Sequence, residues 1–536
     1  MDQNYDTDVL VVGAGPVGLS LALELGLRGD AVMLVERDDT RGPQPRAKTL
    51  NMRSLEHMRR WGIADAIRAA SPSPPDLPTD IVFQTRLYGH HIATLPNIYF
   101  RGNERADDPR FSEPSEWIPQ YLVERVMKAR AETIPGVAFR YGTELVGFEQ
   151  DEVGVTAELR TTAGATSSVR ARYLVGADGA RSPVREAIGA TMTGRHAYGA
   201  NYNMVLDIPE LNEDPPVPRG IMHWTLNADS PGILGPIGDL WYAAKKLPEG
   251  VSGMNEDEIR SFVTGTIGRD VAFRLVAVDP WYAHELIADR YRRDRVFLAG
   301  DACHLHPPFG GYGMNMGIAD AVDLGWKLDA TLHGWAGDAL LDSYEWERRR
   351  VHQWTIDESV ANYAVLSANM VRPDMEADTP AGAAARTELA PHVVEQKRRE
   401  FHTIGMVLGY HYSGSPVIAS DHVLPPPSAE EYDPVALPGA LAPHLWLAPG
   451  VSLYDRFGKG FTLLDRSNSN AGAAAFRDAA ARLGVPFTVL ALDGEGVAAL
   501  YPHALTLVRP DEHVAWTGDG ADAHAATAVL QRVAAR

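Results

Sequence analysis

Three glycine-rich segments hold the residues of this sequence that could do chemistry. The first, Gly13-Ala14-Gly15-Pro16-Val17-Gly18, follows an apolar segment and opens a helical pattern. Gly13 permits a tight turn, Gly15 lets backbone approach a pyrophosphate, and Gly18 lets the helix pack closely on a sheet. The free N–H groups and partial positive charge of that helix N-terminus attract phosphates. The pattern therefore predicts a dinucleotide site.

An acidic residue stands where such a site needs one. Glu36 comes 18 residues after Gly18, at the end of a second apolar segment, and is expected to bond ribose hydroxyls. Arg37 follows it and is a further candidate cofactor contact. This fingerprint does not distinguish FAD from NAD.

The other two segments favour FAD. One is Gly176-Ala177-Asp178-Gly179-Ala180-Arg181-Ser182-Pro183-Val184-Arg185, and the other is Gly300-Asp301-Ala302-Cys303-His304 running on through residues 307–317. All three segments, in this order, resemble the flavoprotein aromatic hydroxylases of the para-hydroxybenzoate hydroxylase and phenol hydroxylase type. The resemblance covers most of residues 5–350 and continues weakly to the C-terminus.

The resemblance implies roles for particular residues. Asp301 would bond the ribityl chain of FAD, and Asp178 would line the region between pyrophosphate and nicotinamide. Arg46 and Gln120 resemble the family's arginine and glutamine near the pyrophosphate and ribityl groups. The candidate cofactor contacts are Gly13, Gly15, Pro16, Gly18, Glu36, Arg37, Arg46, Gln120, Asp178, Gly300, Asp301, Pro308, Gly311, Gly313, Met314 and Asn315.

The third segment also suits a flat ring that gains negative charge on reduction. Gly310, Gly311 and Gly313 allow backbone N–H groups to come close to such a ring. The helix expected from about Asn315 to Leu332 points its positive end at that edge. Tyr312 departs from the family, which often has Gln or Leu there, and it packs near the flavin edge or points outward.

The family's reaction requires a dry site. NADPH or NADH reduces FAD, O2 forms a C4a-hydroperoxide, and its distal oxygen attacks a ring activated by a phenolate. Water must be excluded from this site. Pro307 and Pro308 would form one wall, and strands between 200 and 244 the other. The candidate catalytic residues are Pro307, Pro308, His223 and Tyr242, with Asn203 and Trp224 as further substrate contacts.

Each of these sheet residues could equally be an ordinary packing side chain. No catalytic base stands out, and His304 and His306 are expected to pack or hydrogen-bond near the cofactor. Cys303 is expected to be a small buried residue. Only one strand–turn–helix dinucleotide unit is found, so the nicotinamide is expected to bind transiently in a groove.

The elements that must position these residues form an interleaved α/β chain. We expect a Rossmann-like FAD-binding domain, an inserted β-sheet substrate domain and a C-terminal thioredoxin-like domain. The expected ranges are 1–75, 111–188 and 285–340 for the FAD domain, 76–110 and 189–284 for the substrate domain, 341–424 for a helical region and 440–536 for the last domain. That last domain has no cysteine, so dithiol chemistry is impossible there.

Composition excludes several classes of protein. The 536 residues carry a net charge of −20, which disfavours nucleic-acid and membrane-surface partners. The single cysteine rules out an intramolecular disulfide, and no metal-ligand cluster is visible. We find no signal peptide and no apolar run long enough to span a membrane. A cytoplasmic enzyme with a small aromatic substrate fits these features, and a homo-oligomer is possible.

Other functions remain open on the sequence. A flavin monooxygenase acting on a heteroaromatic, polycyclic or olefinic compound would use the same cofactor segments. A flavin halogenase is disfavoured because no Trp-x-Trp-x-Ile-Pro-like segment occurs. A non-catalytic flavin- or ligand-binding protein is the alternative of another class. The substrate, its position of attack and the choice between NADPH and NADH are not fixed by the sequence.

Overall fold

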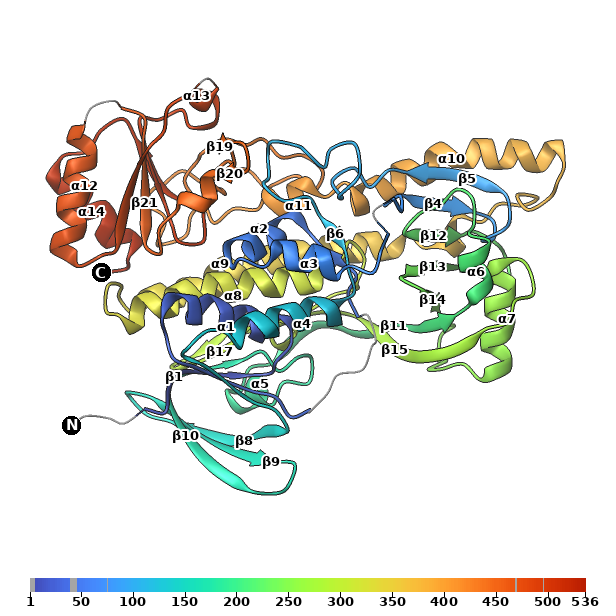
Figure 1. Ribbon diagram of the computed structural model, residues 1–536, viewed down its shortest axis with the longest axis horizontal. Coiled ribbons are helices and arrows are strands. Elements are labelled where there is room, and N and C mark those ends of the chain that lie inside the picture. The colour runs from blue at the N-terminus through green and yellow to red at the C-terminus, as the bar shows by residue number, and fades with distance from the viewer. Residues whose placement is uncertain (1–4, 39–45, 75, 468–469, 495) are drawn as a thin grey trace.

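A largely parallel sheet forms the base of the molecule (Figure 1). The computed structural model describes residues 5–38, 46–74, 76–467, 470–494 and 496–536. Strand β1 (Thr7–Val12) lies between β10 (Thr166–Gly176) and β2 (Val32–Val35), parallel to both. The outer members are β7 (Val137–Arg140), β17 (Val296–Leu298), β16 (Arg292–Arg293), and the hairpin β8 (Thr143–Gln150) and β9 (Val155–Thr161). The nearly continuous apolar side chains of β1 and β2 suit strands covered on both faces.

Helices cover this sheet in a layer that Figure 1 shows above it. Helix α1 (Pro16–Arg28) packs against both α8 (Tyr312–Leu332) and α4 (Gln120–Ala131). The remaining helices of this part are α2 (Met52–Arg60), α3 (Ala64–Ala70), α5 (Pro183–Ala187) and α9 (Ala339–Ala364). Helix α8 begins three residues earlier than expected, because Gly311 adopts a left-handed conformation (φ 67°) and starts it there.

The second sheet is assembled from three separate stretches of chain. Its order is β18-β15-β11-β14-β13-β12-β4-β5, and β4 runs parallel to β12. The strands are β4 (Ile81–Gln84), β5 (His91–Leu95), β11 (Met192–Asp207), β12 (Met222–Thr225), β13 (Gly232–Ile237), β14 (Leu240–Lys246), β15 (Arg274–Ala288) and β18 (His304–Leu305). This is the expected inserted sheet.

The two faces of this sheet have different neighbours. One face buries an apolar cluster against α6 (Pro209–Glu213) and α7 (Glu256–Ile267). The opposite face packs against α10 (Pro380–Phe401) and the flavin-motif residue Phe309. Helix α7 was not expected, although Asn255 and Glu258 form a capping box at its start.

The C-terminal part forms its own four-stranded sheet in the order β22-β21-β23-β24. Its first two strands are parallel and the other pairs antiparallel, with helices between them, as expected for a thioredoxin-like unit. The elements are β21 (Phe461–Asp465), α12 (Asn470–Leu483), β22 (Phe487–Ala491), α13 (Val497–Leu500), β23 (Leu505–Val508), β24 (Val514–Gly518) and α14 (Ala523–Val533). The expected three-part α/β architecture is confirmed.

Short elements connect these parts. They are β3 (Thr49–Leu50), β6 (Glu116–Trp117), α11 (Ile404–Leu408), β19 (Trp446–Ala448), β20 (Val451–Ser452) and the 3₁₀ turns Gly300–Ala302, Ser367–Met370 and Leu453–Arg456. Strand β3 pairs with β6 where the first sheet's helices meet the second sheet. None of the helices within the described ranges has the length and apolarity needed to cross a membrane.

A buried ion network fastens the C-terminal unit to α8 and α9. Arg509 Nη1 lies 2.6 Å from Glu347 Oε1, and Arg509 Nη2 lies 3.1 Å from Asp323 Oδ1. Lys327 Nζ is 2.8 Å from Asp323 and 2.6 Å from Glu347, and Asp511 also pairs with Arg509 at 2.6 Å. Burial raises the pKa of Asp323, whereas Arg509 and Lys327 lower the pKa of Glu347 to about 2 against the opposing effect of its burial. Two cations therefore face three carboxylates, and Arg509 also holds the pKa of Asp511 well below its usual range despite burial.

Candidate active site

The first glycine turn has no room for side chains. A Cβ on Gly13 (φ 104°) would lie 2.3 Å from the carbonyl oxygen of Ala177, and one on Gly18 would lie 1.9 Å from that of Gly13. The turn thus packs directly against the start of the second glycine segment. Pro16 is the first residue of α1, and no side chain caps that helix start within the described residues. The first N–H groups of α1 fit a phosphate.

Glu36 closes the same turn from the end of β2. Its Oε2 accepts a hydrogen bond from the backbone N–H of Ala14 at 2.9 Å, and its Oε1 accepts one from Asp38 at 3.2 Å. The side chain is buried. Arg37, by contrast, is largely exposed, and its Nε lies 3.7 Å from Asp38. The carboxylate of Glu36 fixes the glycine turn while standing at the position expected for a ribose contact.

The second segment contains a buried oxygen without a partner. Asp178 Oδ2 accepts from the N–H of Val184 at 3.1 Å, whereas Oδ1 has no hydrogen-bond partner among the described residues. Burial raises the pKa of this carboxyl. Arg185 donates to the carbonyl of Ala302 (3.1 Å) and to that of Ala180 (3.0 Å), which ties the second segment to the third.

A buried carboxylate on α8, that of Asp320, binds the third segment through hydrogen bonds. Asp320 accepts from the Gly300 N–H at 3.0 Å and from His304 Nε2 at 3.1 Å. Its other oxygen lies 2.7 Å from both Arg348 Nε and His352 Nε2. These partners keep the pKa of Asp320 well below its usual range despite burial. His304 therefore anchors the turn, as expected for a hydrogen-bonding residue near the cofactor.

Asp301, which follows Gly300 in the chain, has surroundings different from those of Asp320. Its side chain is exposed, and no hydrogen bond to it is found among the described residues. Desolvation by the surrounding protein nevertheless raises the pKa of the Asp301 carboxyl, whereas His304 and Arg46 act to lower it. An acceptor left without protein donors, next to the glycine turns, fits the ribityl hydroxyl of FAD.

The start of α8 is fastened to the segment that follows Arg46. Asn315 Oδ1 accepts from the N–H of Asn51 at 3.0 Å, and its Nδ2 donates to the carbonyls of Thr49 (3.0 Å) and Gly311 (2.7 Å). Asn315 thus shapes the backbone that would meet the flavin edge. Gly313 and Met314 lie in the first turn of the same helix.

Four further predicted residues flank this region. Pro308 is exposed, Pro307 is buried and Arg46 is exposed. Gln120 starts α4, donates to Glu124 Oε1 at 2.8 Å, and is held next to the Arg46 segment by a backbone hydrogen bond to Ala47 (2.9 Å). Gln120 therefore lies next to the Arg46 segment, and Pro307 and Pro308 directly precede Phe309 and the third glycine turn in the chain.

Tyr312 and Cys303 are both buried. Tyr312 packs against His306, with ring centroids 6.5 Å apart, so its ring points inward. The Cys303 thiol donates to the carbonyl of Gly300 at 3.3 Å, and burial raises its pKa, as expected for an inert packing residue. The Nδ1 of His306 shares a hydrogen bond of 3.1 Å with the Ser359 hydroxyl, and its Nε2 has no partner among the described residues.

The predicted substrate residues divide between the two faces of the second sheet. His223 points to the far face, where it contacts Trp241 (6.1 Å between centroids) and Gln84. Side chains alternate along a strand, so its neighbour Trp224 points to the opposite face. Burial lowers the pKa of His223 to about 4. The structure does not bring His223 to the cofactor side, because the sheet lies between them.

Trp224 and Tyr242 lie on the cofactor-side face but are fully packed. Trp224 contacts Phe309 (6.1 Å) and lies beneath Lys397 of α10, whose Nζ is 3.7 Å from the ring centroid. Tyr242 donates to the carbonyl of Ile221 at 3.4 Å. Burial raises the pKa of Tyr242 well above its usual value, which disfavours a role as a base. Asn203 is half-buried on the same face.

Two residues of this junction were not among the predicted ones. The Nζ of Lys48 lies 4.4 Å from the ring centroid of Tyr242, and the ring of Trp117 lies 6.1 Å from the same ring. Both residues are sequence neighbours of predicted contacts, Arg46 and Gln120. That proximity was the available signal, because the partner Tyr242 is distant in the chain.

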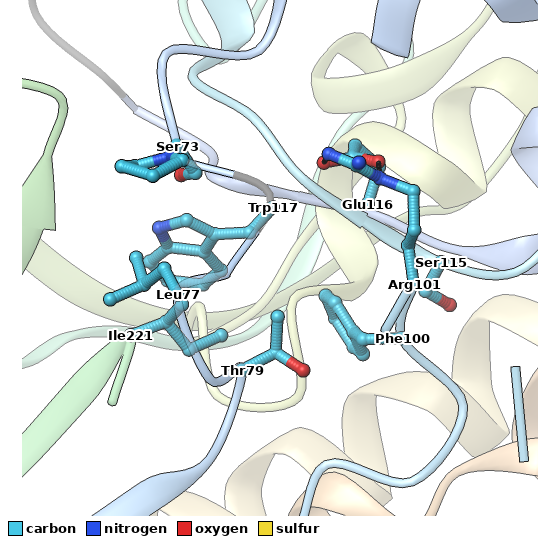
Figure 2. A pocket seen from close by; sticks show the side chains of 10 residues that line it. Ser73, Leu77, Thr79, Phe100, Arg101, Ser115, Glu116, Trp117 and Ile221 are labelled. Carbon is cyan, nitrogen blue, oxygen red and sulfur yellow. Dashed lines mark hydrogen bonds and ion pairs between the residues drawn. The ribbon is translucent and has the colours of Figure 1, made fainter. Parts of the chain in front are cut away.

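A pocket opens beside this aromatic pair at the junction of the two domains. Figure 2 shows Trp117, Leu77 and Ile221 on one side and the paired Arg101 and Glu116 on the other. Its enclosed space is about 20 Å³, which is room for one water-sized group and far below the usual volume of a ligand site. Its lining combines apolar side chains with hydroxyl groups and the Arg101–Glu116 pair.

Comparison with known proteins agrees with this site. Residues 6–359 match the FAD binding domain family and residues 435–536 match the aromatic-ring hydroxylase C-terminal family. A putative polyketide hydroxylase of Streptomyces halstedii is 34% identical, over 96% of this chain and 94% of that protein.

Solved structures agree along the whole chain. The rebeccamycin biosynthetic enzyme RebC with reduced flavin has a TM-score of 0.91 at 34% identity, covering 99% of both chains. A ternary complex of aklavinone-11 hydroxylase with FAD and aklavinone has a TM-score of 0.84 at 31% identity, covering 100% of both chains. The expectation of FAD as cofactor is confirmed. The chain belongs to the family of FAD-dependent aromatic-ring hydroxylases, which are monooxygenases.

Proposed function

We propose that this monooxygenase uses NADPH or NADH and O2 to hydroxylate a phenolic ring of a fused-ring substrate. The observation that carries the proposal is the contact between the rings of Trp117 and Tyr242, which joins strand β6 to strand β14 of the inserted sheet. Relatives named for polyketide and aklavinone hydroxylation support a multi-ring substrate.

The residues of the glycine turns would hold FAD. The α1 N-terminus would receive the pyrophosphate, Glu36 the ribose and Asp301 the ribityl chain. When bound, FAD would accept hydride from the nicotinamide and activate O2. The N-terminus of α8 presents its positive end, and Asn315 keeps that end against the Arg46 segment.

The packed aromatic face of the second sheet would exclude water from the reaction. Phe309 contacts both Trp224 and Tyr363, and the ring centroids of Phe309 and Tyr363 are 5.3 Å apart. Helix α10 covers them from outside. Pro308 stands exposed next to Phe309 and would complete the wall on the cofactor side.

The setting of the reaction is also part of the proposal. The net charge of −20 supports a cytoplasmic enzyme with a small-molecule substrate and without a nucleic-acid or membrane partner. Residues 5–38 contain the one strand–turn–helix dinucleotide unit found in the described chain, so the nicotinamide would bind transiently. A homo-oligomer remains a prediction.

The test is NAD(P)H oxidation by the purified yellow protein in air, with and without a panel of simple phenols and hydroxyanthraquinones. Product and H2O2 are both quantified. Substrate-stimulated oxidation with equivalent hydroxylated product supports the proposal. Stimulated oxidation with oxygenated product only from non-phenolic heteroaromatic or olefinic compounds, tested beside the phenols, favours the heteroaromatic or olefinic alternative. Bound flavin without any ligand-stimulated oxidation contradicts it.

A further inference from the structure

Lys48 is a cation at the domain junction without a carboxylate partner among the described residues. Its backbone is fixed, because its carbonyl accepts from the N–H of Ile118 at 2.8 Å where β3 pairs with β6. Its Nζ lies over the Tyr242 ring at 4.4 Å from the centroid. The face of an aromatic ring compensates the positive charge of Lys48 only partly, so N–H donors of the ammonium stay available to a ligand.

The position of Lys48 links the cofactor segments to the pocket. One residue later, the carbonyl of Thr49 is bound by Asn315 of α8. On the other side, Tyr242 contacts Trp117, and Trp117 lines the pocket in Figure 2. Lys48 and Trp117 therefore contact the same ring, that of Tyr242, one from the segment bound to α8 and the other from the wall of the pocket.

The electrostatic surroundings favour an anionic oxygen beside Lys48. Burial lowers the pKa of Lys48 to about 8, and Asp279 of β15 acts in the opposite direction. Tyr242 of β14 is neutral, and Glu116 of β6 is already paired with Arg101 at 2.7 Å. Arg46, on the same segment, adds positive charge. Below pH 8 the lysine is a poorly solvated cation, which gains most from an oxygen that carries charge.

We propose that Lys48 binds the ionised hydroxyl of the aromatic substrate and holds it as the phenolate. The phenol gives its proton to solvent, and Lys48 remains an ammonium that donates a hydrogen bond to the resulting oxygen anion. The phenolate makes the ring carbons more electron-rich, which is what an electrophilic oxygen transfer requires. This inference rests on the proposed function and names the residue that selects its substrate class.

The experiment uses the FAD-loaded protein and alizarin, a hydroxyanthraquinone whose ionised form absorbs at longer wavelengths than flavin. The absorbance of alizarin saturated with protein is titrated between pH 5 and 8. We expect wild-type protein to lower the pKa of bound alizarin by about one unit or more, as an opposite charge within ~4–6 Å does. K48R should keep this lowering, and K48M should abolish it.

The matched control is K245M. Lys245 lies on the opposite face of the same sheet, 4.9 Å from the Phe262 ring, and its loss should leave the alizarin pKa unchanged. Equal pKa values for wild type and K48M, or no binding of alizarin by wild type, would overturn the assignment. FAD content, measured from flavin absorbance, should be the same in all four proteins.

Failure of this inference and failure of the proposed function give different results. Hydroxylated product formed by K48M with the wild-type rate and pH profile would leave the function standing and remove Lys48 from it. A Lys48-dependent alizarin pKa without hydroxylated product from any phenol would leave the anion site standing and remove the hydroxylase function.

Discussion

Replacing Asp301 by alanine should weaken FAD binding without weakening the fold. The side chain is exposed and has no hydrogen bond to protein among the described residues, so the apoprotein loses little with it. A hydrogen bond to a charged group contributes ~1.5–3 kcal/mol, and each ~1.4 kcal/mol is a factor of ten in affinity. We therefore expect the Kd for FAD to rise about 10- to 150-fold.

The assay is quenching of FAD fluorescence on titration with apoprotein, together with the thermal midpoint of the apoprotein. D239A is the control, because Asp239 is an exposed acid in the turn between β13 and β14. The raised pKa of Asp301 adds a second readout: affinity of wild type should fall in acid as the carboxylate is protonated, whereas that of D301A should change less. An unchanged Kd, or an apoprotein midpoint well below that of D239A, would refute the reasoning.

Three further predictions concern packing and charge. G18A should lower FAD affinity more than about tenfold, measured by the same titration, because its Cβ would meet the Gly13 carbonyl. R509Q should lower the free energy of unfolding by ~3–5 kcal/mol, since it leaves buried carboxylates unpaired, whereas the exposed control R532Q should lower it by ~1 kcal/mol or less. The readout is the thermal midpoint of each variant, and equal midpoints would contradict this prediction. D30N should stabilise the protein increasingly from pH 4 to pH 7 in denaturant titrations, because burial raises the pKa of Asp30 to about 7. Over this range the unfolded chain ionises the carboxyl while the native state keeps its proton, so the wild type loses stability as the pH rises; a gain independent of pH would count against this reasoning.

The sequence predicted the cofactor side of the molecule well because local patterns encode it. The G-x-G-x-x-G turn, its flanking apolar strands and Glu36 lie within about thirty residues, and the structure places them together. In contrast, α7 was missed because its capping box stands in a region rich in strand and turn signals.

The substrate side could not be predicted in the same way. Alternation along β12 shows that His223 and Trp224 face opposite sides, but it does not say which side faces the cofactor. That choice depends on α7 and α10, which pack on the two faces from distant parts of the chain. Lys48 gave no signal of its own, because its contact with Tyr242 joins residues nearly two hundred positions apart.

The order of strands in the first sheet constrains how the protein can be made. Strand β10 pairs with β1 on one side and with β17 on the other, and β17 spans residues 296–298. At ~5–20 residues per second of synthesis, about 6–24 seconds pass between the completion of β10 and that of β17. During that time the nascent chain exposes an apolar strand edge, which is a template for aggregation. Fragments that end before β17 should therefore be poorly soluble, and the FAD-binding part cannot be expressed as one contiguous piece of the chain.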